Sequence, residues 1–269
     1  MSIFSGIKRS YLIIACIGGI LVCICCLLGA IILFYHPESK LSRNEQFYIA
    51  HGGGEIEGYQ KTNSKEAVLN SIHNGMQYVE LDLGMTSDSC LVALHNWRHY
   101  RLIAGCEEVN DLPLSKDEFL NRKIHSKFTP MTIDDIKEIL NDYPNLRIVT
   151  DKISDPAIIN NNFKDFKDRV IIECFSDKDY LELTELGYQC LRSRIAEPKI
   201  LYFFKYKLLG AKQKSYATSI EAYEKRTKNI ILAPPEVETA LYSSKVKRTA
   251  DSIFAEHPNI RFIYIDEVE

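Results

Sequence analysis

Two histidines and two carboxylates lie at the ends of short apolar segments between residues 47 and 95 of this 269-residue chain. The histidines are His51 and His95, and the carboxylates are Glu80 and Asp82 in the segment YVELDL. Carboxylates two positions apart on a strand share one face, where their oxygens can bind Mg²⁺ or Ca²⁺. Two imidazoles can serve as base for an attacking hydroxyl and as acid for a leaving alkoxide. Together these residues indicate metal-assisted hydrolysis of a phosphodiester.

The segments that carry these residues are typical of a parallel α/β unit. Residues 47–50 and 78–83 are predicted strands, and Asn63 begins a predicted helix between them, with Glu66 at the capping-box spacing. The order strand, helix, strand predicts that the two strands are parallel and adjacent. A third predicted strand, LVALH, ends at His95. Barrels of parallel strands gather their catalytic groups at such strand ends.

These motifs resemble the pattern of the glycerophosphodiester phosphodiesterase family, within the superfamily of phospholipase-C-like phosphodiesterases. That family has a strand ending in His-Arg-Gly, an Asn-Thr or Asn-Ser helix start, a strand with Glu-x-Asp, a Thr-x-Asp turn and a strand ending in His. The matching residues here are His51-Gly52-Gly53, Asn63-Ser64, Glu80-Leu81-Asp82, Thr86-Ser87-Asp88 and Leu94-His95. The resemblance is close over residues 47–97 and thinner beyond them.

The resemblance implies roles for the residues of the motifs and for a fourth strand, RIVTDKI. In the family this strand carries a third carboxylate, and Asp151 is the matching position. The expected ligands of a Mg²⁺ or Ca²⁺ ion are Glu80, Asp82 and Asp151. The expected acid and base are His51 and His95, in either order. The expected substrate contacts are Asn63, Lys152 and Trp97, although Asn63 would serve equally well as a helix cap.

Two departures from the family pattern concern positive charge. The family arginine that contacts the phosphate is replaced by Gly52, so another cation must take its place, and Gly52→Arg is expected to tighten or redirect substrate binding. The family lysine is replaced by Ile153, with Lys152 one position early. In a regular strand Lys152 would face the opposite side, unless a bulge shifts the register. Arg98 and Arg192 are the other candidate cations.

The remaining apolar segments complete the strand count of a parallel α/β barrel. Together with the three segments above, five further candidates give the eight strands that such a barrel requires, and predicted helices lie between most of them. These candidates are 147–152, 169–175, 188–193, 229–233 and 260–265. We therefore expect an α/β fold, a (β/α)8 barrel of the TIM type behind an N-terminal transmembrane helix.

Composition suggests where the parts of the chain begin and end. The expected parts are a cytoplasmic flank at 1–10, a transmembrane anchor at 11–35, a linker at 36–46 and a phosphodiesterase-like barrel at 47–269. Residues 97–129 hold no clear strand and are interpreted as an insertion after the third strand. Residues 197–228 are expected to be irregular, with either a cover helix or a membrane-facing or substrate-facing loop. A long helix is expected near 236–256.

The N-terminal apolar stretch predicts a membrane protein with a single span. Tyr11 to Phe34 carries no charge and is long enough to cross a bilayer, and no clear cleavage site follows it. Lys8 and Arg9 abut its start, whereas Lys40 and Arg43 lie farther beyond its end. The positive-inside rule then favours a cytoplasmic N-terminus and a catalytic domain outside the cytoplasm.

Charge and cysteine usage exclude some classes of protein. The net charge of −3 gives no basic surface for nucleic acid. Four of the eight cysteines lie in the apolar stretch, and the spacing of the other four does not suggest zinc. Cys90 with Cys106, or Cys174 with Cys190, would pair in an oxidising compartment, and buried free thiols are equally compatible with the sequence.

The expected function is a membrane-anchored, metal-dependent phosphodiesterase that uses histidine acid–base catalysis. Its substrate would be a glycerophosphodiester or a related lipid or envelope phosphodiester. The alternative is a catalytically inactive barrel that binds a phosphorylated head group or a partner protein. The missing arginine favours the alternative, whereas two histidines and three carboxylates favour the enzyme, because a binding module needs no proton carriers.

Overall fold

The chain divides into two units in the computed structural model. The described residues are 2–34, 45–193, 199–202, 204, 215–227, 239–242, 250–257 and 260–267. The first unit comprises Met1–Glu38, Ala196–Gln213 and Tyr223–Glu236, and the second comprises the remaining residues. Helices α1 (Ser2–Phe34) and α8 (Lys199–Tyr202) belong to the first unit. Within α1, the stretch Ile13–Ile31 is long and apolar enough to be a membrane span or a signal sequence.

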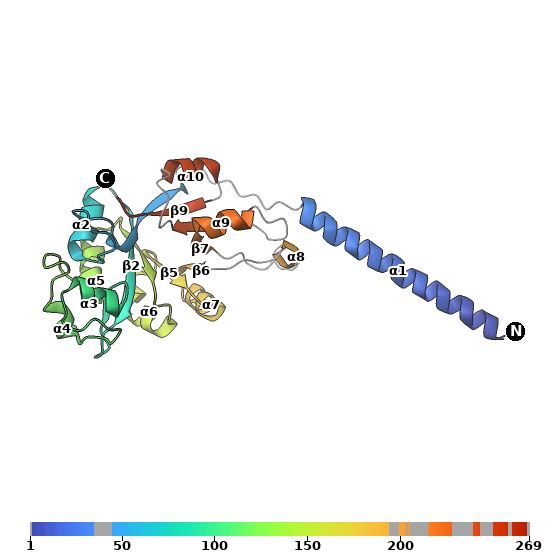
Figure 1. Ribbon diagram of the computed structural model, residues 1–269, viewed down its shortest axis with the longest axis horizontal. Helices are drawn as coiled ribbons and strands as arrows, with labels where there is room; N and C mark the ends of the chain where they lie inside the picture. The colour runs from blue at the N-terminus through green and yellow to red at the C-terminus, as the bar shows by residue number, and fades with distance from the viewer. Residues whose placement is uncertain are drawn as a thin grey trace. The chain divides into compact units, whose positions relative to one another are not determined.

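Eight parallel strands of the second unit form the barrel. They are β1 (Phe47–Ala50), β2 (Tyr78–Met85), β4 (Arg147–Asp151), β5 (Val170–Cys174), β6 (Gln189–Ser193), β7 (Tyr216–Ser219), β8 (Thr239–Tyr242) and β9 (Ile260–Ile265). Each of these strands pairs with the next in the order given, and β9 pairs with β1, so the pairings close the sheet. Figure 1 shows the strands with helices around them. The expectation of a TIM-type α/β barrel is therefore confirmed.

The identity of three strands differs from the prediction. The segment expected to be the third barrel strand is β3 (Leu91–Ala93), which pairs antiparallel with β2 and adds a hairpin beside the barrel. Strands β7 and β8 lie in segments that were expected to be irregular and helical, while the predicted strand at 229–233 lies outside the described residues. A four-residue strand presents only two residues to each face, which is too few for a recognisable alternation.

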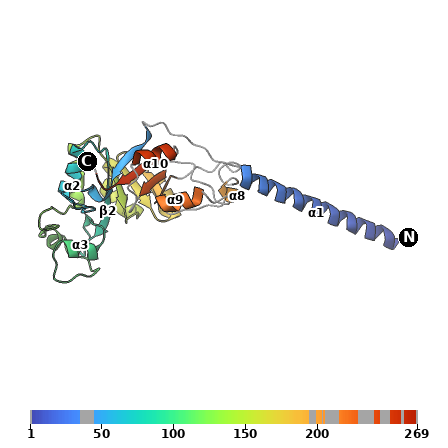
Figure 2. The same cartoon turned by 45° about the horizontal axis from the view of Figure 1, so that its top comes forward.

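The helices follow the strands around the outside of the barrel. Those of the connections within the second unit are α2 (Lys65–His73), α5 (Ile133–Asp142), α6 (Pro156–Phe163), α7 (Asp177–Glu185) and α10 (Ala250–Glu256), whereas α9 (Ile220–Thr227) begins in the second unit and continues into the first. The segment between β3 and α5 contains α3 (Trp97–Ile103) and α4 (Lys116–Leu120). Figure 2 shows α3 beside β2. Short 3-10 turns follow β1 at His51–Gly53 and α6 at Lys164–Phe166.

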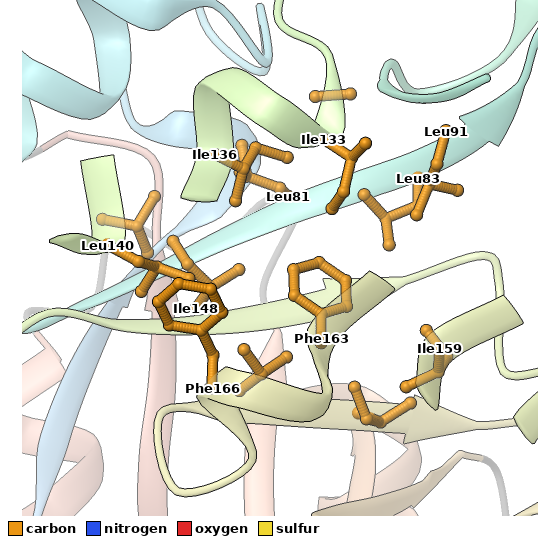
Figure 3. Close-up of a cluster of buried hydrophobic side chains, with 14 of the residues drawn as sticks. Leu81, Leu83, Leu91, Ile133, Ile136, Leu140, Ile148, Ile159, Phe163 and Phe166 are labelled. Carbon is orange, nitrogen blue, oxygen red and sulfur yellow. The ribbon is translucent and has the colours of Figure 1, made fainter. Parts of the chain in front are cut away.

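The core between helices and barrel fixes which way the residues of β2 point. Ile133, Ile136 and Leu140 recur at helical spacing on the buried face of α5. Figure 3 shows these side chains against Leu81 and Leu83 of β2. Because successive side chains of a strand alternate between its faces, the two carboxylates of the Glu-x-Asp motif must point into the barrel.

Candidate active site

A layer of apolar side chains fills the barrel interior beneath a set of polar ones. The apolar layer includes Ile49, Tyr78, Val149, Ile171, Leu191 and Tyr264, one from each of six strands. Two positions farther along the same strands, toward their carboxyl ends, the residues are His51, Glu80, Asp151, Glu173, Ser193 and Asp266. Strand alternation directs both sets inward. The candidate site therefore lies on an apolar layer, at the end of the barrel where the active sites of TIM barrels lie.

Three carboxylates converge in this layer of polar residues. Glu80, Asp82 and Asp151 each offer an oxygen, and these atoms lie within 4.8 Å of one another. Glu80 and Asp82 are only 2% exposed, and Asp82 is level with Asp151 in the pairing of β2 and β4. Burial raises the pKa of Glu80 well above its ordinary value, and the charges of the other two carboxylates act in the same direction. Clustered hard oxygen donors of this kind fit a divalent cation.

Asn63 positions Asp82 by two hydrogen bonds. Its Nδ2 donates to Asp82 Oδ2 at 3.1 Å, and its Oδ1 accepts from the backbone N–H of Asp82 at 2.9 Å. The helix cap is Ser64 instead, and Glu66, which was expected to complete the capping box, accepts hydrogen bonds from Thr129. The cause is the left-handed backbone of Asn63, with φ of 52°, which delays the helix start by one residue.

Each of the two histidines has a carboxylate oxygen close to its Nδ1. His95 Nδ1 lies 3.2 Å from Asp82 Oδ2, and His51 Nδ1 lies 3.0 Å from Asp266 Oδ1. Burial acts to raise the pKa of Asp82, but the hydrogen bond and charge of His95, together with the charge of Lys152, lower it to about 2. At Asp266 burial again acts to raise the pKa, but the close approach and charge of His51 lower it. Both imidazoles therefore have an anionic partner.

Lys152 reaches the carboxylate cluster from the end of β4. Its Nζ lies 2.9 Å from Asp151 Oδ2 and 3.5 Å from Asp82 Oδ1. A regular strand would have turned this side chain away, but Lys152 has a left-handed backbone with φ of 73°. Although burial acts to lower the pKa of Lys152, its hydrogen bond and charge interaction with Asp151 raise it. This amine is therefore a charged partner of two candidate metal ligands.

The tryptophan, the two arginines and the cysteines named in the sequence analysis form no hydrogen bond or ion pair with the three carboxylates within the described residues. Trp97 is buried against Tyr100 and Phe119, and its Nε1 donates to the carbonyl of Met85 at 3.2 Å. Arg192 Nε lies 3.0 Å from Asp177 Oδ1, on the helix side of β6. Arg98 is exposed on α3, and the eight cysteines are free thiols.

Gly52 has no room for a side chain. Its φ is 56°, its N–H donates to Glu80 Oε2 at 2.6 Å, and a Cβ on it would lie 2.6 Å from Lys61 Cα. The structure therefore overturns the expectation that Gly52→Arg improves substrate binding, because the arginine would clash with backbone before it reached a substrate.

We expect even Gly52→Ala to lower the free energy of unfolding by more than about 2 kcal/mol, through left-handed strain and a backbone clash together. Urea unfolding of the full chain in detergent would measure it. Gly58→Ala is the matched control, since Gly58 also has a positive φ, of 80°, but nothing within 4 Å of its Cβ position. Equal losses in the two variants would mean that the clash with Lys61 costs nothing.

Two site residues, Glu173 and Asp266, were not predicted from the sequence. Glu173 is 6% exposed on β5, beside β4, and is hydrogen-bonded to Ser193. Burial raises the pKa of Glu173 to about 7, with the charge of Asp151 as the next cause. A carboxylate inside the apolar run VIIEC was the available signal for Glu173. Asp266 follows the last strand, and its contact with His51 depends on closure of the barrel between β9 and β1.

Comparison with known proteins agrees with this geometry. Residues 56–209 match the model of the glycerophosphoryl diester phosphodiesterase family, a span that contains Glu80, Asp82, His95 and Asp151 and begins after His51. None of the curated proteins compared with this chain matches it.

Solved structures of glycerophosphodiester phosphodiesterases share the fold. A glycerophosphodiester phosphodiesterase from Parabacteroides distasonis is similar with a TM-score of 0.61 at 13% identity, over 82% of this chain and 93% of its own. One from Agrobacterium tumefaciens gives 0.56 at 15%, over 83% and 97%. One from Thermotoga maritima gives 0.55 at 18%, over 83% and 96%. At these identities the likeness shows the fold alone. The family match spans more than half of the chain, which therefore belongs to the glycerophosphoryl diester phosphodiesterase family of phosphoric diester hydrolases.

Proposed function

We propose that this chain hydrolyses a glycerophosphodiester or a related lipid phosphodiester, with His51 and His95 as general acid and base. The observation that carries the proposal is that two carboxylate-held imidazoles accompany a buried cluster of three carboxylates within one barrel end. Metal-dependent phosphodiester hydrolysis needs both components, one for charge and the other for protons.

The divalent cation would be held by Glu80, Asp82 and Asp151. When bound, Mg²⁺ or Ca²⁺ would neutralise charge on the phosphoryl oxygens. Asn63 holds Asp82 in place through both ends of its amide, which favours a rigid site. Lys152 is the proposed substrate contact from β4, because its amine already lies against two of these carboxylates. Asn63 and Trp97 were predicted to contact the substrate. In this proposal Asn63 orients Asp82, and Trp97 supports the segment after β3 by packing and by its hydrogen bond to Met85.

The two imidazoles have the arrangement that acid–base catalysis requires. A carboxylate at Nδ1 favours a proton on that nitrogen and leaves Nε2 to exchange a proton with the reacting oxygens. One imidazole would take the proton of the attacking water, and the other would give a proton to the leaving alkoxide. His51 and His95 are 22% and 41% exposed at their side chains, so both remain accessible to a substrate.

An assay of the purified full chain separates the enzyme from a barrel that only binds. Release of glycerol phosphate from glycerophosphocholine would be measured with Mg²⁺, with Ca²⁺ and after exhaustive chelation. Metal-dependent release supports the proposal. A folded, metal-loaded chain that hydrolyses neither glycerophosphodiesters, lysophospholipids nor cyclic phosphodiesters would instead support the binding module, which the glycine at position 52 favours.

We also propose that α1 anchors the chain in a membrane with the barrel outside the cytoplasm. Support comes from the length and composition of Ile13–Ile31 and from Lys8 and Arg9, which precede it. A protease added to intact cells is expected to spare an N-terminal tag and remove a C-terminal one. Protection of both tags would place the barrel in the cytoplasm, and loss of the N-terminal segment from the mature chain would identify it as a cleaved signal.

A further inference from the structure

We propose that Lys61, in the loop between β1 and α2, binds the anionic phosphoryl group of the substrate. The inference rests on the proposed function and deepens it by naming a cation that recognises the phosphodiester. Three observations carry it: where the side chain of Lys61 starts, what holds its backbone, and the absence of a partner for its amine among the described residues.

The side chain of Lys61 starts in the space that a side chain at position 52 would use. A Cβ atom placed on Gly52 would lie 2.6 Å from Lys61 Cα, 2.9 Å from Lys61 Cβ and 3.2 Å from Lys61 Cγ. Gly52 itself directly follows His51 and donates its N–H to Glu80 Oε2 at 2.6 Å. The first carbons of Lys61 therefore lie beside Gly52, which follows a candidate catalytic histidine and is hydrogen-bonded to a candidate metal ligand.

The loop that carries Lys61 is held by residues of the site. The Asn63 backbone N–H donates to the Gly52 carbonyl at 2.9 Å, while the Asn63 side chain is bonded to Asp82. Lys61 has a left-handed backbone, with φ of 55°, which is costly for a residue that has a Cβ. Such strain persists where surrounding contacts impose it, and it recurs at functional sites. The backbone position of Lys61 is thus fixed relative to Asp82.

The ammonium group of Lys61 has no ion pair or hydrogen bond within the part of the chain that the structure describes. Its charge also helps to lower the pKa of Asp266, the carboxylate beside His51. The amine of the nearby Lys65, by contrast, is paired with Glu138. A half-buried cation without a protein partner beside a phosphodiester site is suited to an anionic ligand.

A phosphodiester carries one negative charge shared by its two non-bridging oxygens, and that charge grows as a hydroxyl attacks. An ammonium group on a flexible stem can follow those oxygens with up to three donors. We therefore expect loss of the Lys61 amine to weaken phosphate binding by about 10- to 100-fold, the usual range for a hydrogen bond that involves a charged group.

The test uses the full chain in detergent with its divalent cation and inorganic phosphate as the probe. The dissociation constant of phosphate would be measured by calorimetry, and KM and kcat with glycerophosphocholine. Lys61→Met is expected to raise the dissociation constant and KM by about 10- to 100-fold, and Lys61→Arg to recover most of the loss. Lys65→Met is the matched control, since its amine pairs with the exposed Glu138, and it is expected to bind phosphate as the wild type does.

Lys61→Gly separates a binding role from a structural one. Glycine adopts a φ of 55° without strain, so this variant is expected to fold at least as well as the wild type while binding phosphate more weakly. A folded Lys61→Gly or Lys61→Met chain with unchanged phosphate affinity would overturn the inference, even if hydrolysis continues. Weaker phosphate binding in these variants, in a chain that hydrolyses no phosphodiester, would uphold the Lys61 site and contradict the proposed function instead.

Discussion

Replacing His51 or His95 with alanine is expected to lower kcat by about two to four orders of magnitude, the usual contribution of a general acid or base. KM should change much less, because proton transfer stabilises the transition state more than the bound substrate. The measurement is the rate of glycerol phosphate release under saturating glycerophosphocholine. His73→Ala is the control, since His73 is exposed in the last turn of α2.

The pH dependence of these variants adds a sharper criterion. If the two histidines divide the roles of acid and base, the bell-shaped pH profile of kcat should lose one limb in each variant, and the limb should differ between them. Loss of less than tenfold in kcat for either variant, with the profile unchanged, would remove that histidine from the proposed mechanism.

Replacing Asp82 with asparagine is expected to have the second large effect. Asp82 contacts His95 and Asn63 and belongs to the carboxylate cluster, so the variant loses both a metal ligand and the anionic partner of an imidazole. We expect a loss of at least about 10- to 100-fold in affinity for the divalent cation, and a drop in kcat no smaller than that of His95→Ala. Metal titration by calorimetry and the hydrolysis assay would measure the two effects.

A double variant tests whether Asp82 and His95 act as one unit. If Asp82 orients His95, then adding His95→Ala to Asp82→Asn should lower kcat little further, because residues that act together are strongly non-additive. Asp134→Asn is the control, since Asp134 is exposed on α5. Unchanged metal affinity in Asp82→Asn, or hydrolysis that survives exhaustive chelation, would show that the cluster does not hold a required cation.

The parts of the site that were predictable from sequence depend on local rules. Strand alternation is enough to place Glu80 and Asp82 on one face, and the apolar residues between and beyond them indicate which face lies in the barrel. The approach of Asp151 follows once β2 and β4 are parallel neighbours. These inferences need only the period of a strand and the topology of a βαβ unit.

The parts that were missed, or were named without their geometry, depend on backbone conformation or on distant pairing. Positive φ values at Asn63 and Lys152 turn each side chain to a place that helix and strand periodicity does not give. The contact between Asp266 and His51 requires the last strand to meet the first, more than 200 residues apart in the chain. The antiparallel β3 was misassigned because a short apolar run carries no information on the direction of its partner.

The antiparallel position of β3 means that the two histidines follow strands of different kinds. His51 follows a strand of the barrel, whereas His95 follows β3, which pairs with β2 through three residue pairs. The segment after it has its own hydrophobic cluster, which includes Trp97, Tyr100 and Phe119. Local opening of such a unit costs less free energy than global unfolding. We therefore expect that local opening of the segment that carries His95 would abolish activity while the parallel strands of the barrel remain folded.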